Sequence, residues 1–189
     1  MPIASTIKMT ARQFIELGEE PAGVRLELVN GEVAVSPSPV PDHSYVEKML
    51  TIILGNHILA HDLGRLYGDV DTIFGAHDVR RPDIIFFSKS RLQLVGPKAM
   101  EGPPDLCVEI ISPSSETIDK VDKYAQYEAA GVAHYWIVDP GGRAAAGFRL
   151  QEGKYVPAGE GRNDEVVHFP PFSDLDLPLG RLWQPPISR

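Results

Sequence analysis

The chain has 189 residues, 43% hydrophobic and 23% charged, which is the composition of an ordinary globular protein large enough to bury a core. Its formal net charge is −8 and its lysines and arginines form no long run, so it lacks the basic footprint of most nucleic-acid-binding proteins. No apolar run reaches the ~20 residues that span a bilayer, and the single cysteine, Cys107, excludes an internal disulfide and a cysteine-rich zinc site. We expect a cytoplasmic protein with no membrane partner and one domain over residues 1–189, with a core at about 10–157 and a tail at 170–189.

The pattern of apolar, turn and capping residues predicts an α/β fold with one mixed β-sheet flanked by helices and an N-terminal β-hairpin. The hairpin turns at Asn30-Gly31, Gly131 ends the last helix, and the proline-rich tail is expected to wrap the surface. The last helix joins two strands and predicts a right-handed parallel crossover. In chain order we expect a helix at 10–18, strands at 24–29 and 32–36, a helix at 42–61, strands at about 65–74 and 79–87, a loop at 88–104 with at most one helical turn, a strand at 105–111, a helix from 112 to 130, a strand at 134–138, and a hairpin of strands at 144–150 and 154–157.

Two carboxylates on separate strands are the main functional signal. Glu109 lies among apolar residues in the strand 105–111, where burial is costly unless a cation or hydrogen-bond donors meet the carboxylate. Asp83 follows Pro82 at the start of another apolar strand. If these strands pair antiparallel, the two side chains converge, and carboxylates are suitable ligands for Mg²⁺ or Mn²⁺. The residues therefore favour a metal site at Asp83 and Glu109.

The other two Pro-Asp pairs are explained without a metal. Asp42 lies at a helix start, where aspartate is a common capping residue. Asp105 precedes the buried glutamate by four strand residues, or ~13 Å at ~3.3 Å per residue, which is too far to share an ion. Asp83 also has an alternative structural role, as a strand-edge aspartate held by Arg80 or Arg81.

The helix that follows the second acidic strand carries Asp119, Lys123 and Tyr127 at a spacing that places them on one face. Ile111 shares the strand face of the buried glutamate, so a lysine that serves the site must come from elsewhere. Lys123 on this helix is the natural source of the lysine, and Lys120 is the competing candidate. Asp119 could orient Lys123 by an ion pair, and Tyr127 could shield it or donate a hydrogen bond. Taken alone, the spacing favours an ordinary exposed Asp–Lys pair.

Motifs between residues 10 and 155 resemble a large bacterial family of restriction-type endonucleases that is especially abundant in cyanobacteria. The segment 108–140 carries the most specific part of this resemblance. The matching motifs are Leu26-Glu27-Leu-Val-Asn-Gly31-Glu32, Ser36-Pro37 with His43, Pro82-Asp83, Val108-Glu109-Ile-Ile-Ser112-Pro113-Ser, Asp119-x-x-x-Lys123-x-x-x-Tyr127, and Gly131-Val-x-x-Tyr135-Trp136-Ile-Val-Asp139-Pro140.

The resemblance implies the PD-(D/E)xK nuclease fold, with Asp83 and Glu109 as metal ligands. That superfamily normally carries a lysine two residues after the second acid, where this chain has Ile111. The implied replacement as the third catalytic residue is Lys123 on the helix.

Two further residues fall at motif positions of the same family. Glu27 is implied as an additional acidic ligand, and its alternative is a solvent-facing position in the hairpin. For His43 at the start of a helix, a capping or surface role is slightly favoured over a role in the site.

The expected activity is metal-dependent hydrolysis of phosphodiester bonds in nucleic acid, with DNA as the partner and Mg²⁺ or Mn²⁺ as the cofactor. Cutting both strands of a duplex would suit a homodimer. The alternative is a catalytically degenerate nuclease-fold module that binds nucleic acid or a protein. The acidic charge and Ile111 favour the module, whereas Asp83, Glu109 and Lys123 favour the enzyme.

Overall fold

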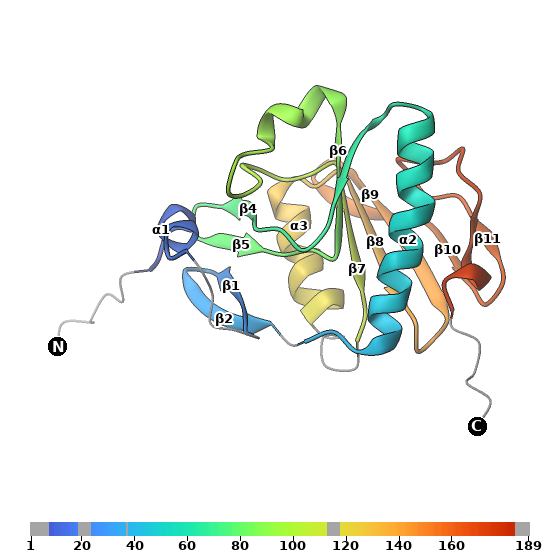
Figure 1. The fold of residues 1–189 in the computed structure, drawn as a ribbon, viewed down its shortest axis with the longest axis horizontal. Coiled ribbons are helices and arrows are strands. Elements are labelled where there is room, and N and C mark those ends of the chain that lie inside the picture. The colour runs from blue at the N-terminus through green and yellow to red at the C-terminus, as the bar shows by residue number, and fades with distance from the viewer. Residues whose placement is uncertain (1–7, 19–23, 37, 113–117, 184–189) are drawn as a thin grey trace.

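The computed structural model describes residues 8–18, 24–36, 38–112 and 118–183, except for the side chains of residues 118–120. Runs of strands are separated by helices along the chain (Figure 1). The helical elements are α1 (Ala11–Glu16), α2 (Pro41–Ala60), the 3₁₀ helix η1 (Lys89–Leu94), the π-helical segment η2 (Ile118–Lys123), α3 (Tyr124–Ala130) and the 3₁₀ turn η3 (Leu179–Arg181). The strands are β1 (Arg25–Val29), β2 (Glu32–Ser36), β3 (Gly64–Tyr67), β4 (Thr72–Gly75), β5 (Asp78–Arg80), β6 (Ile84–Ser88), β7 (Leu106–Ile110), β8 (His134–Asp139), β9 (Ala144–Gln151), β10 (Lys154–Arg162), β11 (Val166–Val167) and β12 (Leu177–Pro178).

The strands form a large sheet of order β10-β9-β8-β7-β6-β3, a smaller sheet of order β2-β1-β5-β4, and the pair β11-β12. In the large sheet β7 and β8 run parallel while the other neighbours are antiparallel, so the predicted mixed sheet and the parallel pairing across the last helix are confirmed. None of the described helices has the length and apolar character needed to cross a membrane.

The two long strands predicted at 65–74 and 79–87 each break in two, and their halves join different sheets. The first break contains Asp69, whose φ of 54° is incompatible with an extended strand. The second break contains Pro82, which has no backbone N–H to donate to a ladder. The smaller sheet, with α1 beside it, therefore stands apart from the large one (Figure 1).

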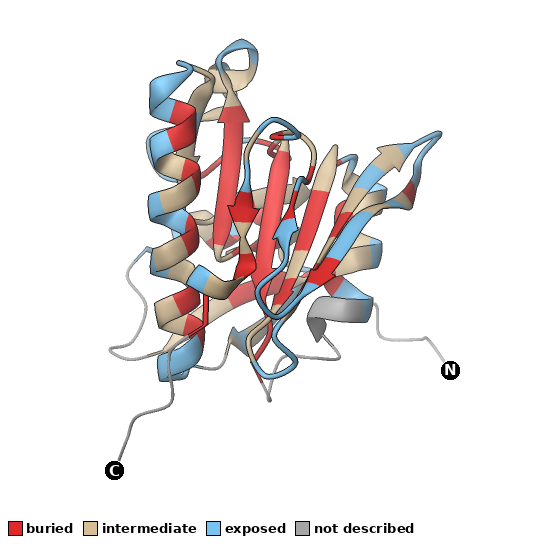
Figure 2. Cartoon of the chain, turned by 90° about the vertical axis from the view of Figure 1, so that its right-hand side faces the viewer, coloured by how far each residue is buried: buried red, intermediate tan, exposed pale blue. Residues whose placement is uncertain are grey.

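The large sheet has helices on both faces, and the period of two along its strands decides which residues meet which helix. Phe86 and Val108 pack with the buried stripe of α2 in one cluster, whereas Phe87 and Cys107 pack with Tyr127 of α3 in another. The central strands are almost wholly buried as a result, and α2 exposes only its outer face (Figure 2).

The C-terminal segment, residues 166–183, belongs to the core, so the prediction that the tail from residue 170 wraps the surface is wrong up to Trp183. Residues of this segment join the cluster on the α2 face of the large sheet. Trp136 Nε1 also donates a hydrogen bond of 2.8 Å to the carbonyl of Pro170. The proline content suggested a surface tail and did not show that the intervening apolar side chains are buried: Phe169, Phe172, Leu177, Leu179, Leu182 and Trp183.

Local signals placed most turns correctly. Thr10 forms a capping box with Gln13, and Asn30-Gly31 turns the β1–β2 hairpin with φ values of 52° and 80°. Gly131 ends α3 in the left-handed region, at φ 81°. Of the helix expected from 112 to 130, residues 113–117 lie outside the described residues.

Two details of helix placement differ from expectation. Val40 is the N-cap of α2 with Pro41 at the first helical position, so Asp42 lies within the first turn and does not cap the helix. The loop at 88–104 contains the six-residue helix η1, which is longer than the single turn expected.

Candidate active site

One pocket at an end of the large sheet is lined by predicted site residues from five separate segments. These are Glu27 of β1, His43 of α2, Asp83 just before β6, Glu109 of β7 and Lys123 at the end of η2. The antiparallel pairing of β6 with β7 is confirmed, and its register places the start of one strand beside the end of the other. The sheet thus gathers residues that are up to 96 positions apart, from 27 to 123.

Glu109 is 1% exposed and is met by two donors from the helix that covers its face of the sheet. Lys123 Nζ donates to Oε2 at 2.7 Å, and the Tyr127 hydroxyl donates to Oε1 at 2.6 Å. Charge-assisted hydrogen bonds of this length offset much of the cost of burying a carboxylate. Lys123 is itself buried, so the alternative of an ordinary exposed Asp–Lys pair is wrong for this lysine.

Burial also fixes the protonation of the groups around Glu109. It raises the pKa of Tyr127 well above the ordinary value, and the neighbouring Glu109 carboxylate raises it further, so Tyr127 stays a hydrogen-bond donor at neutral pH. Burial likewise raises the pKa of the free thiol of Cys107, and the charge of Glu109 is a second, smaller cause of the increase. Cys107 is therefore a buried thiol with little nucleophilic character.

Asp83 is tied to the strand that carries Glu109. Its Oδ2 accepts hydrogen bonds from the backbone N–H of Ile110 at 2.7 Å and from His43 Nε2, at a heavy-atom distance of 3.1 Å. The alternative, in which Arg80 or Arg81 holds Asp83, does not describe this arrangement. Arg80 binds Glu27 and Gln126, and Arg81 binds Asp71.

His43 has neither of the roles that the sequence favoured for it. It is 8% exposed, so it is not a surface residue, and it lies in the first turn of α2 and not at the cap. Its ring contacts Asp83, which orients that carboxylate. This contact joins α2 to the residue just before β6 and therefore depends on tertiary packing.

Glu27 is buried at 5% exposure, so the solvent-facing alternative is wrong. Its Oε2 accepts from Arg80 Nη1 at 2.9 Å and its Oε1 accepts from the backbone N–H of Arg81 at 3.1 Å. Burial by itself lowers the pKa of Arg80, but the charge of Glu27 and its hydrogen bond outweigh this effect and raise the pKa. Arg80 Nε also donates to Gln126 Oε1 at 2.7 Å, and this hydrogen bond links the smaller sheet to α3.

The structure does not describe the side chains of two of the predicted site residues, and it adds two residues for which the sequence predicted no role in the pocket. The side chains of Asp119 and Lys120 lie outside the described residues. Arg80 was considered only as a partner of Asp83, and Ser112, which is 5% exposed and lines the pocket, was not singled out. The signal for Ser112 was its place directly after the acidic strand, within a motif of the resembled family.

The donor set of the pocket fits a hard divalent ion held by two carboxylates. Mg²⁺ commonly binds one or two protein carboxylates and keeps several waters. Asp83 Oδ1 takes part in no hydrogen bond among the described residues, whereas both oxygens of Glu27 and both oxygens of Glu109 already accept one. In the described part of the chain, no three of Glu27, His43, Asp83 and Glu109 bring ligand atoms within 4.8 Å of one another. Asp83 is therefore better placed than Glu27 to bind an ion, and Glu109 would bind one through the remaining lone pairs of oxygens that already accept from Lys123 and Tyr127.

Comparison with protein-family models matches residues 11–180 to the Uma2 family, described as putative restriction endonuclease. The chain belongs to the Uma2 family. A crystal structure of a putative nuclease belonging to DUF820, from Anabaena variabilis ATCC 29413, is similar with a TM-score of 0.75 at 22% identity, over 93% of this chain and 97% of that chain. The type IIG restriction endonuclease BpuSI has a TM-score of 0.40 at 16% identity, over 66% of this chain and 14% of that chain. Comparison with curated proteins finds no match.

The similarity to the Anabaena protein confirms the restriction endonuclease-like fold that the motifs implied. In this member of the Uma2 family, Ile111 occupies the position where the PD-(D/E)xK superfamily normally has its lysine. A lysine nevertheless contacts the second acid, because Lys123 reaches Glu109 from the neighbouring helix. The pocket thus combines two carboxylates with a lysine, and the lysine comes from a helical segment and not from the strand of Glu109.

Proposed function

We propose that this Uma2-family chain is a metal-dependent endonuclease that hydrolyses phosphodiester bonds of DNA. The observation that carries the proposal is the meeting of Asp83, Glu109 and Lys123 in one pocket, with Lys123 Nζ 2.7 Å from Glu109 Oε2. Two carboxylates can hold Mg²⁺ or Mn²⁺, which assists phosphodiester hydrolysis, and a nearby lysine can offset the negative charge of the phosphate. Family membership supports nuclease chemistry, and the ion and the substrate are parts of the proposal.

Asp83 and Glu109 are the residues that would hold the ion. The ion would supply Lewis acidity toward a phosphate oxygen and toward the attacking water. Lys123, held against Glu109, would place a fixed positive charge where negative charge develops on the phosphoryl group. Tyr127 and His43 would act as positioning residues, because one donates to Glu109 and the other contacts Asp83.

Basic side chains at the pocket support an anionic substrate despite the net charge of −8. Arg25, Arg80 and Arg81 line it together with Lys123. A local group of cations can attract a phosphate backbone where the surface as a whole does not. Cleavage of both strands of a duplex would further require two pockets, which a two-fold homodimer provides.

The rival proposal is a degenerate module that binds nucleic acid or protein without cleaving it. Ile111 and the acidic charge favour that reading. The buried ion pair between Lys123 and Glu109 weighs against the binding module. Burying two charges costs free energy, and an apolar pair of similar size would stabilise the fold as well. A chain without catalytic activity would therefore gain little from keeping these two charges.

The decisive experiment is cleavage of supercoiled plasmid DNA in Mg²⁺ or Mn²⁺, with EDTA as the metal-free reference. We expect nicking that EDTA abolishes and that Asp83→Asn and Glu109→Gln lower by about 10²-fold or more. Circular dichroism and thermal denaturation check that each variant is folded.

A matched pair of lysine variants tests the unusual position of the lysine. Lys123→Met should lower cleavage strongly, whereas Lys154→Met, which removes an exposed lysine paired with Glu128, should leave it unchanged. Cleavage that persists in folded Asp83→Asn would contradict the proposed site. A folded wild-type protein that cleaves neither DNA nor RNA would favour the binding module.

A further inference from the structure

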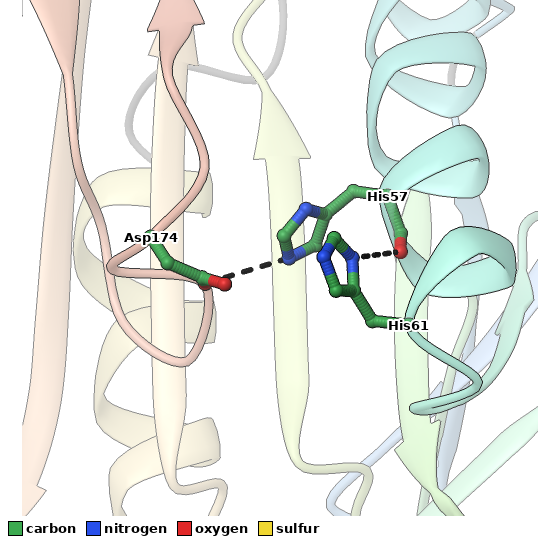
Figure 3. A group of neighbouring side chains, drawn as sticks. All are labelled: His57, His61 and Asp174. Atoms are coloured by element: carbon green, nitrogen blue, oxygen red, sulfur yellow. Dashed lines mark hydrogen bonds and ion pairs between the residues drawn. The ribbon is translucent and has the colours of Figure 1, made fainter.

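Two histidines and an aspartate meet near the C-terminal end of α2, away from the candidate active site. His57 and His61 come from the helix and Asp174 from the C-terminal segment (Figure 3). One ligand atom from each of the three residues lies within 4.8 Å of the other two. His43 lies fourteen residues before His57 on the same helix, so the two groups are separated by ~21 Å along the axis at ~1.5 Å per residue.

The hydrogen bond of His61 determines which of its ring nitrogens can bind a ligand. Its Nδ1 lies 3.0 Å from the carbonyl oxygen of His57. Because a carbonyl oxygen only accepts hydrogen bonds, Nδ1 must carry the proton, and Nε2 of the neutral ring then presents a lone pair. A backbone carbonyl that fixes the tautomer in this way is typical of metal-binding histidines.

His57 contributes a buried nitrogen that is directed into the group. The residue is 8% exposed, and its Nε2 is buried without a hydrogen-bond partner among the residues that the structure describes. This nitrogen lies 3.5 Å from Asp174 Oδ1, beyond the usual length of a hydrogen bond (Figure 3). A buried imidazole nitrogen that lacks a partner needs a ligand to offset its lost hydration.

Asp174 is exposed but sits in a turn whose ends are anchored. The N–H of Phe172 donates to Phe169 O at 2.9 Å, and the N–H of Leu175 donates to Phe172 O at 3.0 Å. Phe172 is 2% exposed and packs edge-on against the His57 ring, with centroids 5.5 Å apart. The backbone around Asp174 is therefore set by the core, and its carboxylate faces the two rings.

The position at the end of α2 adds to the attraction for a cation. His61 is the C-cap residue of the helix. The C-terminal end of a helix carries a partial negative charge, which stabilises a nearby positive ion. Histidines at positions i and i+4 also lie on one helix face, as metal-binding pairs on helices do.

We propose that His57, His61 and Asp174 form a second metal site, specific for Zn²⁺ or a similar divalent transition ion. Two imidazoles and one carboxylate suit Zn²⁺ far better than Mg²⁺, which prefers oxygen ligands. The bound ion would link the end of α2 to the C-terminal segment and so hold that segment on the large sheet. The site does not rest on the proposed nuclease activity, because none of its residues lines the pocket of Asp83 and Glu109.

The test is a calorimetric titration of the full chain, freed of metal by a chelator, with Zn²⁺ alone, together with thermal denaturation with and without Zn²⁺. All proteins carry Asp83→Asn, so that the other carboxylate pocket contributes less to Zn²⁺ binding. We expect one site per chain and a raised melting temperature. Because His61 and Asp174 are exposed, His61→Ala and Asp174→Asn should fold and should lower the Zn²⁺ affinity by at least about tenfold.

A second histidine–aspartate pair in the same segment provides the control. His168 and Asp176 are both exposed, with Nε2 and Oδ1 2.7 Å apart, and their substitution by Ala and Asn should change neither the Zn²⁺ affinity nor the Zn²⁺-dependent shift in melting temperature. Absence of Zn²⁺ binding, or binding that His61→Ala and Asp174→Asn leave unchanged, would overturn the proposal and identify the contact of His57 with Asp174 as a simple ion pair.

Discussion

At the scale of single residues, the strongest constraint in the site is the pairing of two buried charges. Glu109 and Lys123 are 1% and 8% exposed, and they are held 2.7 Å apart by different elements. Each would be costly to bury alone, since an isolated buried charge loses its hydration without compensation. The pair is therefore coupled in stability as well as in the proposed chemistry.

A double-mutant cycle should show this coupling. Lys123→Met alone leaves the Glu109 carboxylate without its cation and should lower the free energy of unfolding by about 3–5 kcal/mol. Lys123→Met combined with Glu109→Gln should be less destabilised than the sum of the two single variants, by about 0.5–3 kcal/mol. Urea denaturation of the four proteins measures these terms. Strict additivity would show that the two charges do not stabilise each other.

At the scale of elements, the C-terminal segment behaves as part of the core and not as an appendage. It pairs β11 with β12, and Phe172 packs against Phe86 of β6, with ring centroids 5.0 Å apart. The cluster that it completes also contains the buried stripe of α2. Loss of this packing would expose one face of the large sheet.

Phe172→Ala should therefore lower the free energy of unfolding by about 3–5 kcal/mol, because it opens a cavity between α2, the sheet and the C-terminal segment. Val166→Ala in the same segment is the matched control, since Val166 is 52% exposed and its truncation should change stability by less than about 0.5 kcal/mol. Chemical denaturation monitored by tryptophan fluorescence gives both values. Equal, small effects would mean that the segment contributes little to the fold.

At the scale of the whole molecule, the acidic charge should limit the electrostatic part of DNA binding. The arginines that line the pocket are already engaged, with Arg25 2.6 Å from Asp69, Arg81 2.7 Å from Asp71 and Arg80 2.9 Å from Glu27. Cations that are paired within the protein release fewer counterions from a phosphate backbone.

We expect the logarithm of the DNA affinity to fall with the logarithm of the salt concentration with a slope smaller than about 4 in magnitude, since each neutralised phosphate contributes about 0.9. Asp69→Asn frees Arg25 at the pocket and should steepen the slope by about one unit and tighten binding. Asp176→Asn makes the same change in net charge elsewhere on the surface. Equal effects of the two variants on fluorescence-anisotropy titrations would contradict a local role for Arg25.

The sequence by itself determined the features that depend on neighbouring residues. The apolar neighbours of Glu109 in β7 indicated a buried carboxylate that needs a partner, the spacing of Lys123 and Tyr127 placed both on one helix face, and Asn30-Gly31 fixed the hairpin turn. These relations follow from the periods of strand and helix and from local backbone sterics, so they can be predicted without knowledge of the packing.

Only the tertiary structure decided the contacts between distant segments. It paired Glu27 with Arg80 and His43 with Asp83, buried Phe172, and brought Asp174 to His57. Each of these contacts depends on how sheets and helices pack. At these positions the local sequence did not show whether the side chain is exposed or is buried against a partner. The physical reason is that the cost of burying a polar side chain is offset by a partner that local periodicity cannot identify.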